Sequence, residues 1–247
     1  MKEYLKNAVA SGLAKAGKAL VRSNQLGVDP FRDVAQLLGC PPGQISCVFD
    51  VGANVGTFTI EGRKAFPQSR FFAFEPVHAT FLKMQRRLAG DDMVQTLECA
   101  LGAETGTANI SVFDGRDAVS SLKPDADFTV RRGYLASGQE EISVDTLDNV
   151  CRNLGVETID LLKIDVEGYE AEVLKGANAA LSSGKVRSIL MEFTFVSPGK
   201  GNNSSLVELA DLLAPFGYEF ATCYTEWCDP LKDRFYATHN ALFVLPR

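Results

Sequence analysis

The sequence has little of what a metal-binding, disulfide-bonded or membrane-spanning protein needs. It holds two histidines and six cysteines in 247 residues, and no Cys-x-x-Cys spacing occurs, so neither a zinc site nor a disulfide framework is indicated. Glycines, serines and lysines interrupt the N-terminal segment, which therefore lacks the apolar core of a signal peptide or a membrane span. These absences predict a cytoplasmic chain with reduced thiols.

Positive charge is also scarce. Lys and Arg total 25 against 31 for Asp and Glu, and the formal net charge of -6 disfavours binding to a phosphate backbone. Nucleic acid is therefore not an expected partner. The 46% hydrophobic and 23% charged content is typical of globular chains, and the length suits one α/β domain with an appendage.

The predicted appendage is an N-terminal helical extension over residues 1–44, followed by the main domain over 45–247. Leu5, Val9, Leu13, Ala16 and Leu20 recur at helical spacing among lysines, which predicts a basic amphipathic helix. Such a helix can pack on the core or form a homodimer contact; the alternative is contact with a membrane surface.

From residue 45 onward, short apolar runs alternate with helical patterns, which predicts a doubly wound α/β sheet with helices on both faces. Residues 109–113 and 141–144 alternate like antiparallel strands around an insertion, and the last two strands could pair as a hairpin at the sheet edge. The other predicted strands cover 46–51, 70–74, 94–99, 159–164, 186–193, 218–223 and 241–245, and the helices cover 57–66, 77–88, 146–154, 170–181 and 206–213.

The turn after the first predicted strand is the most distinctive motif, and it reads Phe-Asp-Val-Gly-Ala-Asn-Val-Gly-Thr-Phe over residues 49–58. Small residues between a strand and a helix let a ligand approach the backbone. Gly52 and Gly56 do not complete the G-x-G-x-x-G pattern of dinucleotide-binding turns. A tight turn without a ligand is the alternative.

An acidic residue, Glu75, ends the second predicted strand about 20 residues beyond this turn, where a carboxylate can accept hydrogen bonds from both hydroxyls of a ribose. Alone it could be a solvated strand-end acid. The turn and the acid together predict a bound nucleoside.

Further acids follow the later strands. Asp165 and Glu167 come directly after the strand over 159–164, where open α/β sheets hold their ligands, and Glu192 ends the next strand. These carboxylates could act as a general base, orient another group or bind a metal, although no metal is predicted. The alternative is that Glu167 or Glu170 caps the following helix.

The ordered set of these motifs resembles the FkbM family of S-adenosylmethionine-dependent methyltransferases from about Val48 to Val244. Besides the turn and the Lys163 to Glu170 segment, the matching segments are Phe74-Glu75-Pro76, Cys99-Ala100-Leu101-Gly102, Ser120-Ser121-Leu122, Thr146-Leu147-Asp148 and Asn240-Ala241-Leu242-Phe243.

The resemblance implies the Rossmann-like methyltransferase sheet, mostly parallel with an antiparallel last strand over residues 241–245. It implies S-adenosylmethionine as cofactor, with Glu75 on the ribose, Ala100 and Leu101 beside the adenine, and Asp165 and Glu167 facing the transferring methyl group. The residues implied to bind the cofactor are Asp50, Gly52, Asn54, Gly56, Thr57, Phe58, Glu75, Pro76, Ala100, Leu101 and Asp165. The acceptors that it suggests are hydroxyls on sugars or polyketide-type natural products.

An alcohol is a poor nucleophile at neutral pH, so a general base is expected, and Asp165, Glu167 or His239 could supply it. His78 is expected on the adenine side or at the surface. The insertion over 114–140 could be a lid whose Arg131 and Arg132 engage an anionic acceptor; the alternative is a mobile loop.

Three other functions fit parts of the pattern. An NAD(P)-dependent oxidoreductase shares the sheet, but the third glycine and a Tyr-x-x-x-Lys pair are missing. A nucleic-acid N-methyltransferase typically shows Asp/Asn-Pro-Pro-aromatic where this chain has Asp165-Val166-Glu167-Gly168. A non-catalytic nucleoside-binding module would keep the fold without turnover.

Overall fold

The structure of the chain is a computed structural model that describes residues 25–112, 138–193, 205–228 and 237–246. The predicted N-terminal amphipathic helix lies outside the described residues, and so do nearly all of the predicted insertion and its arginines.

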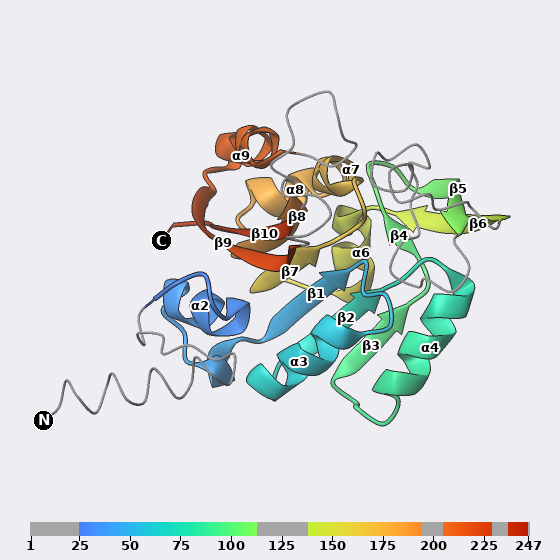
Figure 1. Ribbon diagram of the computed structural model, residues 1–247, viewed down its shortest axis with the longest axis horizontal. Coiled ribbons are helices and arrows are strands. Elements are labelled where there is room, and N and C mark those ends of the chain that lie inside the picture. Colours follow the sequence, from blue (N-terminus) through green and yellow to red (C-terminus); the bar gives the residue numbers. More distant parts are fainter. Residues whose placement is uncertain (1–24, 113–137, 194–204, 229–236, 247) are drawn as a thin grey trace, which may run out of the picture.

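A seven-stranded sheet in the order β3-β2-β1-β7-β8-β10-β9 forms the centre of the molecule (Figure 1). β10 is antiparallel to both of its neighbours, and the other pairs are parallel. The doubly wound sheet, its antiparallel strand and the C-terminal hairpin are thereby confirmed. The strands are β1 (Cys47–Val51), β2 (Arg70–Phe74), β3 (Val94–Leu97), β7 (Leu161–Ile164), β8 (Ser188–Phe193), β9 (Glu219–Cys228) and β10 (Ala237–Val244).

Helices cover both faces of this sheet. On one face, α2, α3 and α4 pack side chains such as Phe31, Phe66 and Met84 against the strands. On the other, α6 to α9 bury side chains such as Leu147, Val173 and Leu209. The helices are α2 (Pro30–Leu37), α3 (Thr57–Ala65), α4 (His78–Leu88), α6 (Leu147–Leu154), α7 (Glu170–Lys175), α8 (Asn178–Ser182) and α9 (Leu206–Leu213), with short 3-10 turns at Pro42–Gln44 and Ala214–Phe216.

The central strands β1, β7 and β8 are buried at every position. Strands covered on both faces require apolar side chains throughout, which is why these segments read as nearly continuous hydrophobic runs. The charged residues Asp50, Lys163 and Glu192 depart from that rule, and all three lie toward the carboxyl ends of their strands. Because buried polar side chains cost stability unless they are paired, these positions mark the edge where function is expected.

The structure differs from the predicted elements in two places. The predicted strand over 94–99 ends at Leu97, and the chain then forms β4 (Ala100–Leu101), which joins β5 (Gly106–Val112) and β6 (Gly138–Asp145) in a separate three-stranded sheet. The predicted helix over 170–181 is two helices separated at Gly176. A Cβ at Gly176 would lie 2.0 Å from the carbonyl oxygen of Gly102, so this close backbone approach requires glycine.

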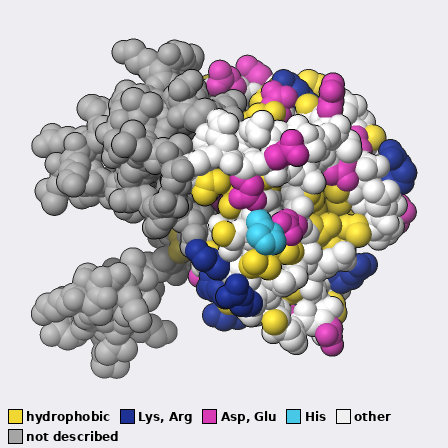
Figure 2. Space-filling view, turned by 90° about the vertical axis from the view of Figure 1, so that its right-hand side faces the viewer, with side chains coloured by type: hydrophobic (Ala, Val, Ile, Leu, Met, Phe, Trp, Pro, Cys, Tyr) yellow, Lys and Arg dark blue, Asp and Glu magenta, His cyan; other side chains and the backbone are white. Residues whose placement is uncertain are grey.

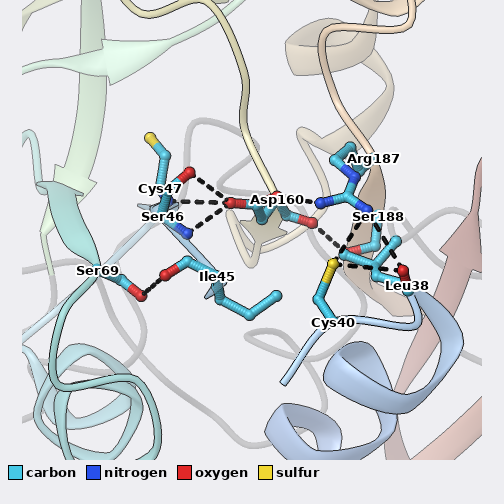
Figure 3. Close-up of polar contacts among 9 residues, drawn as sticks. All are labelled: Leu38, Cys40, Ile45, Ser46, Cys47, Ser69, Asp160, Arg187 and Ser188. Carbon is cyan, nitrogen blue, oxygen red and sulfur yellow. Dashed lines mark hydrogen bonds and ion pairs between the residues drawn. The ribbon is translucent and has the colours of Figure 1, made fainter. Parts of the chain in front are cut away.

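At the amino end of the strands, Asp160 joins β1, β7 and β8 (Figure 3). Its Oδ2 accepts hydrogen bonds from Ser46 N at 2.7 Å, Ser46 Oγ at 2.8 Å and Cys47 N at 3.2 Å. Its Oδ1 lies 2.6 Å from Nη1 of Arg187. Because Asp160 is only 2% exposed, these four contacts satisfy a carboxylate that would otherwise be buried at high cost. Asp160 therefore stabilises the end of the sheet opposite to the site.

Two simple properties of the chain can be read from the described residues. No helix among them is both long and apolar enough to cross a membrane.

The cysteines at positions 40, 47, 99, 151 and 223 are free thiols. Burial raises the pKa of the Cys47 thiol to about 12, as expected for a thiol that serves in packing.

Candidate functional site

The loops that follow β1 and β7 meet at the carboxyl edge of the sheet. Gly52 has a φ of 77°, and a Cβ built on it would lie 1.8 Å from the carbonyl oxygen of Asp165. The amide of Asp165 donates in turn to the carbonyl of Val51 at 3.0 Å. The two loops are thus in direct backbone contact, and only glycine fits at position 52.

The β1 loop is also attached to the end of β2. The amides of Gly52 and Ala53 donate to the carbonyl oxygen of Phe74 at 3.1 and 2.8 Å. Asn54, in the left-handed region with a φ of 53°, donates its amide to Oε2 of Glu75 at 3.0 Å, and the amide of Val77 donates to Oε1 at 3.0 Å. The predicted turn and the predicted acid are therefore adjacent.

Glu75 is held rigidly in an apolar environment. Glu75 is only 7% exposed. Burial raises the pKa of its carboxyl group to about 7, although the hydrogen bonds from the two backbone N–H groups lower it. A carboxylate offers about four lone-pair positions, and the two amides occupy one on each oxygen. The remaining positions suit a ligand that presents two neighbouring hydroxyls.

The start of α3 completes the β1 loop. Gly56 caps the helix with a φ of 80°, and its Cβ position is 3.2 Å from Met84 and 3.0 Å from Leu88. Thr57 is exposed at the first turn. Phe58 points toward α2, where its ring centroid lies 4.8 Å from that of Phe31. Thr57 therefore borders the site, whereas Phe58 supports it from beneath.

Lys163 is a site residue that the sequence reasoning left without a role. Its Nζ lies 3.4 Å from Oδ1 of Asp50 and 3.1 Å from Oδ2 of Asp165, and it approaches the ring of Phe58 at 5.2 Å. Asp50, fully buried, accepts a hydrogen bond from Oγ1 of Thr59 at 2.7 Å. The signal was a lysine inside an otherwise apolar strand, a residue type that is almost never buried unless paired.

The β7 loop is strained at the position of a predicted catalytic residue. Glu167 has a φ of 53° and Gly168 a φ of 95°. Oε1 of Glu170 accepts hydrogen bonds from the amides of Val166 at 3.3 Å and Gly168 at 3.0 Å. Glu170 therefore braces the loop preceding α7. Left-handed backbone at a residue other than glycine costs about 1 kcal/mol or more and clusters at functional sites.

Two buried acids predict how stability depends on pH. Burial raises the pKa of both Glu75 and Glu170 from 4.5 to about 7. Between these values the folded protein holds more protons than the unfolded chain, so the free energy of unfolding falls as the pH rises from about 4.5 to about 7. In Glu170→Gln we expect the free energy of unfolding to fall less over this pH range than in wild type, by on the order of 1–3 kcal/mol. Urea unfolding across the pH range measures the difference.

The control for this prediction is Glu61→Gln, which changes an exposed acid on α3. It should leave the slope of unfolding free energy against pH unchanged. A Glu170→Gln protein with the wild-type slope would show that the Glu170 carboxyl is ionised throughout this range.

The segments predicted to flank an adenine lie beside the Glu75 turn. Ala100 packs with Val77 in a small apolar cluster, Leu101 enters the main core, and Pro76, which follows Glu75 in the chain, is half-buried. His78 begins α4 with a side chain that is 60% exposed, and its Nδ1 lies 2.7 Å from Oε1 of Glu98. His78 is therefore at the surface next to this region.

The candidate bases are not all on one side of the sheet. Asp165 is joined to Lys163 on the face that carries α2 and α3, and Glu167 follows in the same loop. His239 pairs with Phe193 in register and its ring stacks on that of Phe193 at 5.4 Å, on the opposite face. Burial lowers the pKa of His239. The structure thus groups the acids and places His239 apart from Lys163.

Charge at the surface is mixed. On the face that carries α4 and the small sheet, Lys and Arg side chains occur in separate groups among Asp, Glu and apolar side chains (Figure 2). Within the described ranges, no three His, Cys, Asp or Glu side chains come close enough together to hold a metal ion.

Comparison with known proteins identifies a matching family and several relatives. The model of the methyltransferase FkbM domain matches residues 50–220, well over half of the 247 residues. Methyltransferase sdnD of Sordaria araneosa is 30% identical over 62% of this chain and 67% of its own. The 31-O-demethyl-FK506 methyltransferase FkbM of Streptomyces tacrolimicus is 30% identical over 67% of this chain and 71% of its own.

A solved structure shares the architecture. The METTL16 MTase domain superposes with a TM-score of 0.51 at 12% identity and covers 85% of this chain and 64% of its own. At this identity the likeness concerns the fold alone. It agrees with the α/β class of this mostly parallel sheet.

Proposed function

The chain belongs to the FkbM methyltransferase family, and from this premise we propose that it is an S-adenosylmethionine-dependent methyltransferase acting on a hydroxyl of a sugar or natural-product small molecule. The observation that carries the proposal is the buried Glu75 carboxylate, which the amides of Asn54 and Val77 hold next to the glycine-containing β1 loop. A buried acid beside a loop with close backbone approach is what a ribose and its attached chain require.

The residues around this loop fit the cofactor. Glu75 would accept hydrogen bonds from the ribose hydroxyls, and Ala100 and Leu101, with Pro76, would flank the adenine. Gly52, Asn54 and Gly56 would surround the methionine part, with Thr57 at its border. Asp50 supports this fit because its buried Oδ1, 3.4 Å from the ammonium of Lys163, accepts no hydrogen bond from the described residues and is left as an acceptor beside the β1 loop. Phe58 would act from beneath, by packing against Lys163.

When bound, the cofactor supplies a methyl group on a positively charged sulfur. That carbon would become attached to the acceptor oxygen, the sulfur would keep the electron pair of the broken carbon–sulfur bond, and the hydroxyl proton would be released. The protein's part is to hold the acceptor in line, to exclude water and to receive the proton. Asp165 and Glu167 would receive it in preference to His239, because they lie in the loop next to Gly52.

The acceptor class is supported by chemistry and by one relative. The relative from Streptomyces tacrolimicus is named for methylation at an oxygen of FK506. The acids at this edge can accept a hydrogen bond or a proton from a hydroxyl. The proposed partner is accordingly a small molecule with a hydroxyl group; a homodimer through the N-terminal segment and the absence of nucleic-acid binding remain proposals.

Calorimetric titration with S-adenosylhomocysteine tests the cofactor. We expect wild-type protein to bind it in the micromolar range and Glu75→Ala to bind at least about tenfold more weakly, since hydrogen bonds to a buried carboxylate contribute about 1.5–3 kcal/mol. Glu104→Ala, which removes an exposed acid, is the matched control and should bind like wild type. Binding of NADH without binding of S-adenosylhomocysteine would contradict the proposal.

A further inference from the structure

A row of polar side chains crosses the sheet near its carboxyl edge, on the face that carries α2 and α3. Lys163 of β7 pairs in register with Asp50 of β1 and with Leu190 of β8. Glu192 lies two residues beyond Leu190, and its partner in β10 is Asn240. Because paired residues share a face and every second residue returns to it, all four polar side chains lie on one side of the sheet.

Asn240 has a buried side-chain oxygen for which the described residues provide no hydrogen-bond donor. The residue is 2% exposed. A buried amide oxygen without a donor destabilises the fold. The fold does not need an amide here, because the strand continues with the apolar residues Ala241 and Leu242 and asparagine is disfavoured in strands.

Glu192 lies directly across from Asn240 and is 7% exposed. Side chains at directly opposed positions of antiparallel strands have Cβ atoms about 5 Å apart, so the carboxylate and the amide can act on one ligand group. An ionised carboxylate only accepts hydrogen bonds, and so does the amide oxygen. The pair therefore selects a ligand that donates hydrogen bonds, as a hydroxyl does.

The pair also lies beside the proposed cofactor site. Ile164 of β7 pairs with Met191 of β8, so Asp165, which follows β7, and Glu192 of β8 each lie one residue beyond that pair. The side chain of Asp165 is 27% exposed, so solvent reaches this end of the row. A group bound by Glu192 and Asn240 would thus be next to the loop that Gly52 contacts.

We infer that Glu192 and Asn240 form the subsite in which the hydroxyl of the acceptor meets the transferring methyl group. This inference rests on the proposed function, since it needs the cofactor to occupy the β1 loop. Asp165 and Glu167 of the β7 loop are thereby joined by two further residues, Glu192 and Asn240, which orient the acceptor.

Sinefungin tests the subsite without knowledge of the acceptor. In this cofactor analogue a carbon that bears an ammonium group replaces the sulfur and its methyl group, so N–H donors point from the methyl position toward the place of the acceptor hydroxyl. We expect Glu192→Gln to lose about tenfold or more of the sinefungin affinity, because a charged partner of the ammonium is removed. Its affinity for S-adenosylhomocysteine should stay within about twofold of wild type, because that ligand has no such group.

A second variant and a control complete the calorimetric comparison. Asn240→Leu should lower the ratio of sinefungin affinity to S-adenosylhomocysteine affinity in the same direction, and retained S-adenosylhomocysteine binding reports that each variant is folded. Glu219→Gln, at an exposed acid of β9, should leave the ratio unchanged. An unchanged ratio in Glu192→Gln and Asn240→Leu would overturn the subsite alone, whereas a wild-type protein that binds neither ligand would overturn the proposed function.

Discussion

Replacing Gly52 by alanine should cost about 4 kcal/mol of unfolding free energy and abolish measurable binding of S-adenosylhomocysteine. About 1–2 kcal/mol of this comes from the left-handed backbone, which alanine tolerates poorly. The rest comes from the contact with Asp165, because the new Cβ would lie 1.8 Å from its carbonyl oxygen. One of the two loops must move away, and the proposed site lies between them. Urea unfolding and calorimetry measure the two effects.

Gly90→Ala is the matched control for this variant. Gly90 has a similar φ of 88°, but a Cβ there would meet nothing within 4 Å. It should therefore show only the backbone cost of about 1–2 kcal/mol and bind S-adenosylhomocysteine normally. If Gly52→Ala lost no more unfolding free energy and no more S-adenosylhomocysteine affinity than Gly90→Ala, the described contact between the β1 and β7 loops would be contradicted.

Replacing Asp160 by alanine should lower the free energy of unfolding by about 3–4 kcal/mol, because removal of one partner leaves buried donors and Arg187 without their acceptor. The loss includes three hydrogen bonds to Oδ2 from Ser46 and Cys47 and the ion pair of Oδ1 with Arg187. Urea unfolding of the variant measures it. Since this cluster lies at the amino end of the strands, binding of S-adenosylhomocysteine should be retained at temperatures where the variant is folded.

An exposed ion pair provides the comparison for Asp160. Asp91 pairs with Arg63 at 2.8 Å, but the Asp91 side chain is 35% exposed. Asp91→Ala should cost only about 0–1 kcal/mol, as solvated ion pairs do. Equal losses in the two variants would mean that the contacts of Asp160 contribute no more than a surface pair.

Local patterns sufficed to predict the main sheet. Continuous apolar runs identified β1, β2, β7 and β8, because strands buried on both faces must be apolar throughout. The glycines and Glu75 identified the region of the site, because both features follow directly from the chain order of a strand, a turn and a helix. The pairing of the last two strands could be predicted for the same reason, since they are neighbours in sequence.

The features that sequence reasoning missed depend on contacts between distant segments. β4 has two residues and forms only by pairing with β6, more than 40 positions later in the chain. The role of Lys163 depends on its position between Asp50 and Asp165. The face of His239 and the burial of Asn240 follow from the register of β10 with β8, which the sequence of one strand does not contain.

Conformational strain and buried charge coincide at one end of this sheet. The two non-glycine residues with positive φ among those described, Asn54 and Glu167, lie in the loops after β1 and β7. Both loops also contain or contact an acid whose pKa burial raises to about 7. At the opposite end, Asp160 has a full set of partners. The buried acid at the amino end is therefore satisfied by the protein itself, whereas strain and raised pKa values gather at the carboxyl end.

A crystal structure of the protein with S-adenosylhomocysteine tests the central claim most directly. We expect both ribose hydroxyls to lie within hydrogen-bonding distance of the Glu75 carboxylate and the amino-acid chain of the ligand to run over the β1 loop toward Asp165. A ligand bound elsewhere, or one whose ribose makes no contact with Glu75, would contradict the account.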